Sequence, residues 1–182
     1  MNVAAVHTCI REFVAATSGQ VRGLWFSSAM HSLMGLDRHG DPLTPSITWA
    51  DSRARPQAER NQAALGALEL HKRTRTPAHP MAPLSKLIWF SEQEPALFAR
   101  VRHWVGVKNY MSLRMCDELV TDHSLASGSG LLDIGCLHGI RRLWNWLGLT
   151  RHSRPSSSPP PQFCRGFQLK RSRQRACRQR RK

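Results

Sequence analysis

The chain has 182 residues and five cysteines, but it contains no Cys-x-x-C pair. The cysteines lie singly at positions 9, 116, 136, 164 and 177, so their spacing indicates neither a zinc site nor a disulfide framework. No apolar run reaches the ~18 residues that a membrane span needs, and the first residues show no signal-peptide core. These absences favour a cytoplasmic chain in a reducing environment, without a membrane partner.

Acidic residues are absent from the last part of the chain. All twelve Asp and Glu lie at or before Asp133, where fourteen Lys and Arg leave a net charge of only +2. Residues 134–182 hold the other thirteen basic residues and no acid. The formal net charge of +15 therefore describes a nearly neutral body joined to a strongly basic tail.

The body alternates patterns that are typical of helices and strands. Helices are predicted over 3–17, 53–73, 83–93, 94–102 and 108–116, and strands over 21–29, 31–37, 45–51, 103–107 and 118–124. Three prolines make residues 74–83 a loop. The alternation predicts an α/β layer architecture. Four tryptophans in apolar runs are expected in its core: Trp25, Trp49, Trp89 and Trp104.

Polar groups collect at the ends of the predicted strands. His31 follows the first strand, Asp51 ends the third, and Arg53 comes just after it. Ligands of α/β sheets usually bind at strand ends, so a site is expected there. Asp51 or Ser52 is also expected to cap the following helix.

Four stretches in one order resemble the FGGY family of carbohydrate kinases. They are SSAMHSLMGLD, GDPLTPSITWADSR, KRTRTPAHPMAPLSKLIWF and VTDHSLASGSGLLDI, and the resemblance covers roughly residues 1–134. It is nearest to gluconokinase-type and xylulokinase-type members. It implies part of an actin-like, ribonuclease H-like α/β kinase domain, which binds the sugar. The family uses ATP and Mg²⁺ to phosphorylate a hydroxyl of a sugar, aldonate or polyol, with gluconate the favoured substrate here.

The resemblance assigns sugar contacts to five residues: Met30, His31, Asp51, Arg53 and His123. A lone histidine is more often structural, but the surrounding SSAMHSL favours sugar contact for His31. Asp51 can serve as cap and ligand together, whereas Arg53 is either a ligand or a solvated residue. His123 either lines the cleft or pairs with a neighbouring loop. The imidazole of His31 and the carboxylate of Asp51 are expected to converge on one hollow.

The chain also departs from the family pattern. Arg75 stands where the family has glycine, which implies a cost of about 1 kcal/mol if the backbone there is left-handed. The family's glycine-rich phosphate hairpin and its general-base Asp have no counterpart here, so no catalytic, cofactor-binding or metal-binding residue is assigned. ASGSG (126–130) lacks the Lys of a phosphate loop and is expected to be a flexible turn. A fragment with negligible kinase activity alone is expected.

The tail, residues 135–182, is expected to be disordered, because its Ser, Pro and Arg runs bury little apolar surface. Its abrupt, acid-free composition suggests translation in a shifted reading frame, which the coding DNA beyond codon 134 would test. Two alternatives stay open: a non-enzymatic remnant, and nucleic-acid binding by the tail, which would be salt-dependent and non-specific. The sequence leaves the oligomeric state undetermined.

Overall fold

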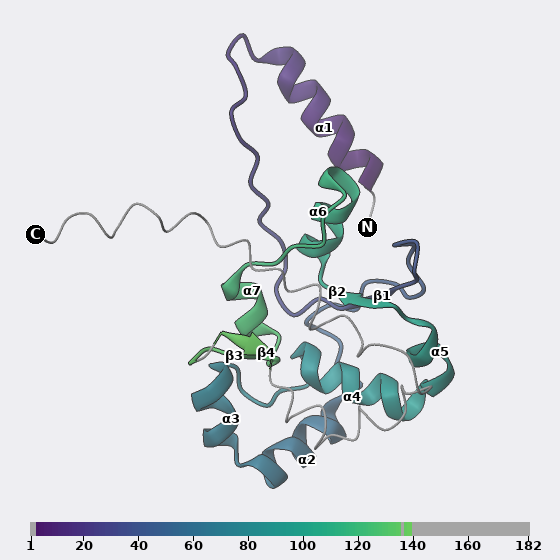
Figure 1. Cartoon of the computed structure of the whole chain (residues 1–182), viewed down its shortest axis with the longest axis vertical. Helices are drawn as coiled ribbons and strands as arrows, with labels where there is room; N and C mark the ends of the chain where they lie inside the picture. Colours follow the sequence, from purple (N-terminus) through teal and green to yellow (C-terminus); the bar gives the residue numbers. More distant parts are fainter. Residues whose placement is uncertain (1–2, 136, 140–182) are drawn as a thin grey trace, which may run out of the picture.

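The computed structural model describes residues 3–135 and 137–139. These residues form mainly helices, with a few short strands between them in the sequence (Figure 1). The helices are α1 (Val3–Ala16), α2 (Arg55–Leu65), α3 (Ala67–Thr74), α4 (Pro83–Gln93), α5 (Pro95–Arg100), α6 (Val107–Cys116) and α7 (His123–Gly128). The strands are β1 (Met34–Leu36), β2 (His103–Val105), β3 (Leu132–Asp133) and β4 (His138–Gly139). No described helix is long and apolar enough to span a membrane.

An antiparallel ribbon of β1 and β2 separates two apolar clusters. Gly35 pairs with Trp104, and the flanking pairs are Met34 with Val105 and Leu36 with His103. Alternate side chains of a strand point to opposite faces. The larger cluster therefore includes Trp104 and residues of α4 and α5, whereas the smaller one joins Met34, Leu36, Val105 and Tyr110.

Gly35 permits the close packing on the first of these faces. A Cβ at this position would lie 2.6 Å from Cγ2 of Val101 and 3.3 Å from the Trp104 ring. The first distance is shorter than real Cβ contacts and the second is tight. The glycine therefore lets Val101, just after α5, and the Trp104 ring pack closely on this face of the ribbon.

The strand predicted over 45–51 is reduced to one isolated bridge, between Ile47 and Leu33, and a second bridge joins Pro42, outside that range, to Leu36 of β1. Leu33 and Ile47 exchange backbone hydrogen bonds of 2.9 and 2.8 Å. Between the bridges the Thr44 hydroxyl accepts a 2.9 Å bond from the Gly35 amide. Pro42 and Pro45 have no N–H to donate, which explains why no continuous ladder forms.

Helix α4 is the central element, and nearly its whole circumference is buried. Pro83 occupies the first turn of α4, where no N–H donor is needed. The helix packs against α2 and α5 (Figure 1). The single helix predicted over 53–73 is instead α2 and α3. They are divided by Gly66, which has a φ of +73° that a helix interior does not allow.

Helix α3 ends at Arg75, which adopts the left-handed conformation (φ 57°, ψ 15°). The conformation expected for the missing glycine is therefore present. The following loop is held in place, because the Thr76 hydroxyl donates a 2.7 Å bond to the carbonyl of Ser127. Ser127 in turn donates a 2.9 Å bond to the carbonyl of Thr74.

The N-terminal region projects from the remainder of the molecule (Figure 1). Helix α1 forms as predicted but buries no residue, although its Val3 packs against the smaller cluster. Residues 21–29 form no strand and are largely exposed. The prediction that Trp25 and Trp49 belong to the core is wrong, because their exposed fractions are 87% and 61%, whereas Trp104 is buried.

The predictions for the second half are confirmed in part. The helices over 83–93, 94–102 and 108–116 and the strand over 103–107 are present, with slightly different ends. The strand predicted over 118–124 is wrong, because Asp122 caps α7 there by accepting a 2.9 Å bond from the Leu125 amide. ASGSG is not a free turn, since it closes α7 and is mostly buried. The expectation of a disordered tail lies outside the described residues apart from 135 and 137–139.

Candidate functional site

Asp51 and Arg53 form a bidentate pair in the turn that precedes α2. Arg53 Nε lies 2.9 Å from each carboxylate oxygen, and its Nη2 lies 2.8 Å from Oδ2. The Arg53 amide also donates a 3.0 Å bond to Oδ1. The expected capping role is wrong, because the residue that caps α2 is Ala54, without a side-chain bond. Both carboxylate oxygens of Asp51 therefore accept hydrogen bonds from Arg53.

The guanidinium of Arg53 also stacks on α4. Its central carbon lies 4.8 Å from the ring centroid of Trp89. Such a cation–π contact holds the planar group in one orientation. Arg53 Nη1 makes no hydrogen bond among the described residues, and the side chain keeps an exposed fraction of 41%. Arg53 can therefore donate to an anionic ligand without leaving Asp51.

Burial alone would raise the pKa of Asp51. The hydrogen bonds and positive charge of Arg53, together with the charge of Lys86, outweigh burial and lower that pKa below its usual value. The carboxylate therefore stays ionised at neutral pH, and it acts as a fixed hydrogen-bond acceptor and not as a proton donor.

His31 has an uncommon backbone conformation. Its φ is 60°, in the left-handed region that non-glycine residues rarely adopt and that is often seen at functional sites. Its Nδ1 is buried and has no hydrogen-bond partner. Burial is the main cause that lowers the pKa of His31, so the ring is neutral at pH 7.

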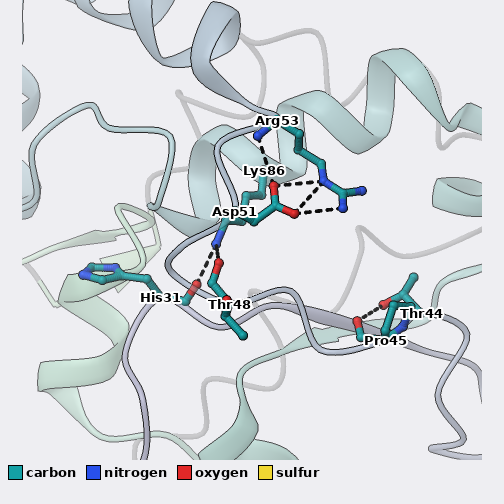
Figure 2. A network of polar contacts seen from close by, with 7 residues as sticks. All are labelled: His31, Thr44, Pro45, Thr48, Asp51, Arg53 and Lys86. Atoms are coloured by element: carbon teal, nitrogen blue, oxygen red, sulfur yellow. Dashed lines mark hydrogen bonds and ion pairs between the residues drawn. The ribbon is translucent and has the colours of Figure 1, made fainter.

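Lys86 of α4 joins the two predicted site segments (Figure 2). Its Nζ donates a 2.9 Å bond to the carbonyl of His31 and a 2.6 Å bond to the carbonyl of Thr48. The side chain is fully buried. We call Lys86 with these two carbonyls the Lys86 junction. Burial lowers the pKa of Lys86 to about 8; the charge of Asp51 opposes this effect and that of Arg53 adds to it.

Sequence reasoning missed Lys86, although a signal was present. The lysine stands among Leu84, Leu87 and Ile88 in the run PLSKLIWF, whose other positions are apolar except for one serine. Lysine is rarely fully buried without partners. A lysine in such a helix therefore indicates a buried acceptor, but the pattern does not say which one.

Figure 2 shows the imidazole of His31 pointing away from the carboxylate of Asp51. The expectation that both side chains line one hollow is therefore wrong. His31 lines a separate cavity of about 60 Å³, together with residues of β2, α6 and α7 that include Lys108, Asn109 and Leu125. Only the backbone of His31 meets the segment of Asp51, at the Lys86 junction.

The other two predicted site residues, Met30 and His123, lie near opposite ends of α7. Met30, next to His31, is 41% exposed, and its Cε occupies the space beside Gly128 of α7. His123 begins α7 at the opposite end, is exposed, and takes no part in the Lys86 network. The neighbouring Asp122 binds Lys108 at 2.7 Å. The structure thus pairs Asp51 with Arg53 in one turn and joins that segment to the backbone of His31 through Lys86. The side chains of Met30 and His31 lie toward Gly128 of α7 instead, and His123 lies apart.

Comparisons with known proteins agree with the fold and the motif order. Residues 2–160 match the N-terminal domain of the FGGY family of carbohydrate kinases, so the match continues beyond position 134. Gluconokinase of Bacillus subtilis is 38% identical over 131 residues, which are 72% of this chain and 26% of that protein. A xylulose kinase of Lactococcus lactis is 36% identical over 63% of this chain and 23% of its own length.

A solved gluconate kinase from Lactobacillus acidophilus superposes with a TM-score of 0.75 and 34% identity, over 80% of this chain and 30% of that one. This confirms the predicted fold class, part of an actin-like α/β kinase. The chain spans about a quarter of the length of the curated relatives it matches. From the family match, the chain belongs to the FGGY family of carbohydrate kinases.

Proposed function

We propose that this chain supplies one wall of a sugar-binding site, in a kinase that phosphorylates a hydroxyl of gluconate or a related sugar acid. The observation that carries the proposal is the Lys86 junction, which joins the backbone of His31 to the segment of Thr48, Asp51 and Arg53 in a chain of the FGGY family. Both segments carry groups that can bind a polyol. Hydrogen bonds between such groups and the hydroxyls of a sugar discriminate strongly between sugars with different hydroxyl patterns.

An anionic sugar suits this wall better than a neutral one. Arg53 and Lys86 carry positive charge against the single carboxylate of Asp51, and Arg53 Nη1 is free to donate among the described residues. A guanidinium binds a carboxylate through short, charge-assisted bonds. The exposed indole of Trp49 and the half-exposed Met30 supply apolar surface nearby in sequence. Gluconate is therefore the proposed ligand, and D-xylulose is the neutral comparison.

The described residues do not fit ATP and Mg²⁺, which the family uses. Within residues 3–135 and 137–139, no three His, Cys, Asp or Glu side chains gather as a metal site requires. Amides at the end of ASGSG are already bonded: Ser129 N to the Leu125 carbonyl and Gly130 N to the Ser127 carbonyl. Both oxygens of Asp51 are held by Arg53. The proposed role of Asp51 and Arg53 is therefore limited to binding and orienting the sugar, and no step of phosphoryl transfer is assigned to the described residues.

Titration calorimetry of the full chain with D-gluconate, D-xylulose and D-glucose tests the proposal. We expect gluconate to bind more tightly than either neutral sugar, with an affinity that falls as salt screens the charge. Absence of binding by all three, in a chain shown by circular dichroism to be folded, would overturn it. Equal binding of all three would overturn the preference for an anionic sugar.

A further inference from the structure

The buried lysine lies beneath the proposed sugar wall without reaching its surface. Lys86 has no exposed area, and two of its three ammonium protons are used by the carbonyls of His31 and Thr48. A ligand that binds at the surface of the chain therefore cannot contact Lys86. Whatever Lys86 contributes to binding passes through the two segments that it holds.

These two segments have few other links. Beside the Lys86 junction, Leu33 and Ile47 exchange a pair of backbone hydrogen bonds. On one side of this link stands His31, whose left-handed backbone has an intrinsic energetic cost. On the other side stand Thr48 and the turn that carries Asp51 and Arg53. Two charge-assisted bonds from one ammonium are well suited to hold such a turn in place.

We propose that Lys86 is a positioning residue for sugar binding: its ammonium fixes the His31 turn and the Thr48–Asp51 turn relative to each other. This inference rests on the proposed function, because it concerns the same wall. Without the ammonium, the chain still has every side chain of the wall. The two backbone segments that carry these side chains, however, are no longer fixed relative to each other. The ligand then has to order both turns when it binds, and affinity falls.

The charged groups around Lys86 make this role visible in a pH titration. Asp51 and Arg53 face it. The pKa of Asp51 is lowered, so its carboxylate stays ionised in this range, and His31 is already neutral there because burial lowers its pKa. His79 is the other titratable group near the His31 turn. Since the pKa of Lys86 is about 8, gluconate affinity is expected to fall as pH rises from 7 to 9.

Protein stability should change in the opposite direction over this range. The folded chain releases the Lys86 proton near pH 8, whereas the unfolded chain keeps it to about 10.5. The unfolded state then binds more protons, so this group makes the free energy of unfolding rise with pH above 8. A lysine that only supported the core would make affinity and stability change together.

The test compares Lys86→Met and Lys86→Gln with two controls in the full chain. Ile88→Val removes a methyl group from the same buried helix, and His79→Gln removes the neighbouring imidazole. We expect Lys86→Met to weaken gluconate binding about tenfold or more and to abolish the pH step. Lys86→Gln can still donate to a carbonyl and should fold, with a smaller loss and no step. Both controls should keep the step.

Amide hydrogen exchange gives a readout that needs no ligand. In Lys86→Met and Lys86→Gln, the Leu33 and Ile47 amides should exchange faster than in wild type, while the core amides of α4 change as little as in Ile88→Val. A uniform increase across the protein, or wild-type affinity with an unchanged pH step, would overturn the role of Lys86. If wild type binds no sugar, the proposed function fails, and the exchange pattern still decides whether Lys86 fixes the two turns.

Discussion

Arg53 binds both carboxylate oxygens of Asp51 while its guanidinium lies over Trp89. The pair belongs to a turn that the Lys86 junction holds next to His31. One arginine therefore connects the site turn to the central helix. A flexible ammonium at the same position would keep the charge but would lose both the planar fork and the stacking.

Arg53→Lys should accordingly weaken gluconate binding about tenfold, because the donor geometry toward the sugar acid is lost. The pair is partly exposed, so the free energy of unfolding should change by less than about 1 kcal/mol. Calorimetry and urea denaturation measure the two effects. Arg60→Lys is the matched control, since Arg60 forms a surface pair with Glu92 outside the site. Equal loss of affinity in both variants would contradict the assignment.

Gly128→Ala should alter the site without unfolding it. The new Cβ would lie 2.6 Å from Cε of Met30, which is the end of a flexible side chain and can move away. We expect a change in stability within about 1 kcal/mol, because alanine also favours the helix, together with reduced sugar affinity as Met30 is displaced. Gly130→Ala is the contrasting variant. Its φ of +75° and its 3.2 Å approach to Leu84 Cβ predict a clear loss of stability. The reverse order of stabilities would refute this explanation.

Arg75→Gly should stabilise the chain by about 1 kcal/mol, because glycine adopts the left-handed conformation without the steric cost paid by arginine. Arg75 is exposed and ends α3 in that conformation, so the substitution loses little packing. Thermal and urea unfolding measure the gain. Lys72→Gly, in the interior of the same helix, should instead destabilise the chain by about 1 kcal/mol. Destabilisation by both substitutions would show that the end of α3 is not strained.

Trp25→Ser should reduce self-association of the full chain. Residues 21–29 pair with no strand in the part of the chain that the structure describes, and the exposed fractions are 87% for Trp25 and 51% for Leu24. Exposed apolar segments with free backbone groups promote aggregation. Light scattering over a concentration series should show smaller particles for the variant, with an unchanged melting temperature. Trp49→Ser, which removes an exposed indole from another segment, is the control and should have a smaller effect.

Much of the local structure could be predicted from the residues. Pro83 and Pro95 mark the first turns of α4 and α5, the apolar spacing of residues 3–16 predicts α1, and the prolines of 74–83 exclude regular structure. Errors arose where a pattern depended on partners. Residues 21–29 have the composition of a strand but pair with no strand of the described residues, and only Ile47 of the strand predicted over 45–51 forms a bridge.

For the site, the sequence by itself determined which residues are candidates and to which family the motifs point, because residue types and short spacings are local properties. Only the tertiary structure decided that Asp51 is held by Arg53 and that the imidazole of His31 turns to a separate cavity. It also decided that Lys86, 55 positions from His31, binds that residue's carbonyl. Backbone carbonyls are the same in every residue, so no sequence pattern can reveal which of them a buried ammonium will find.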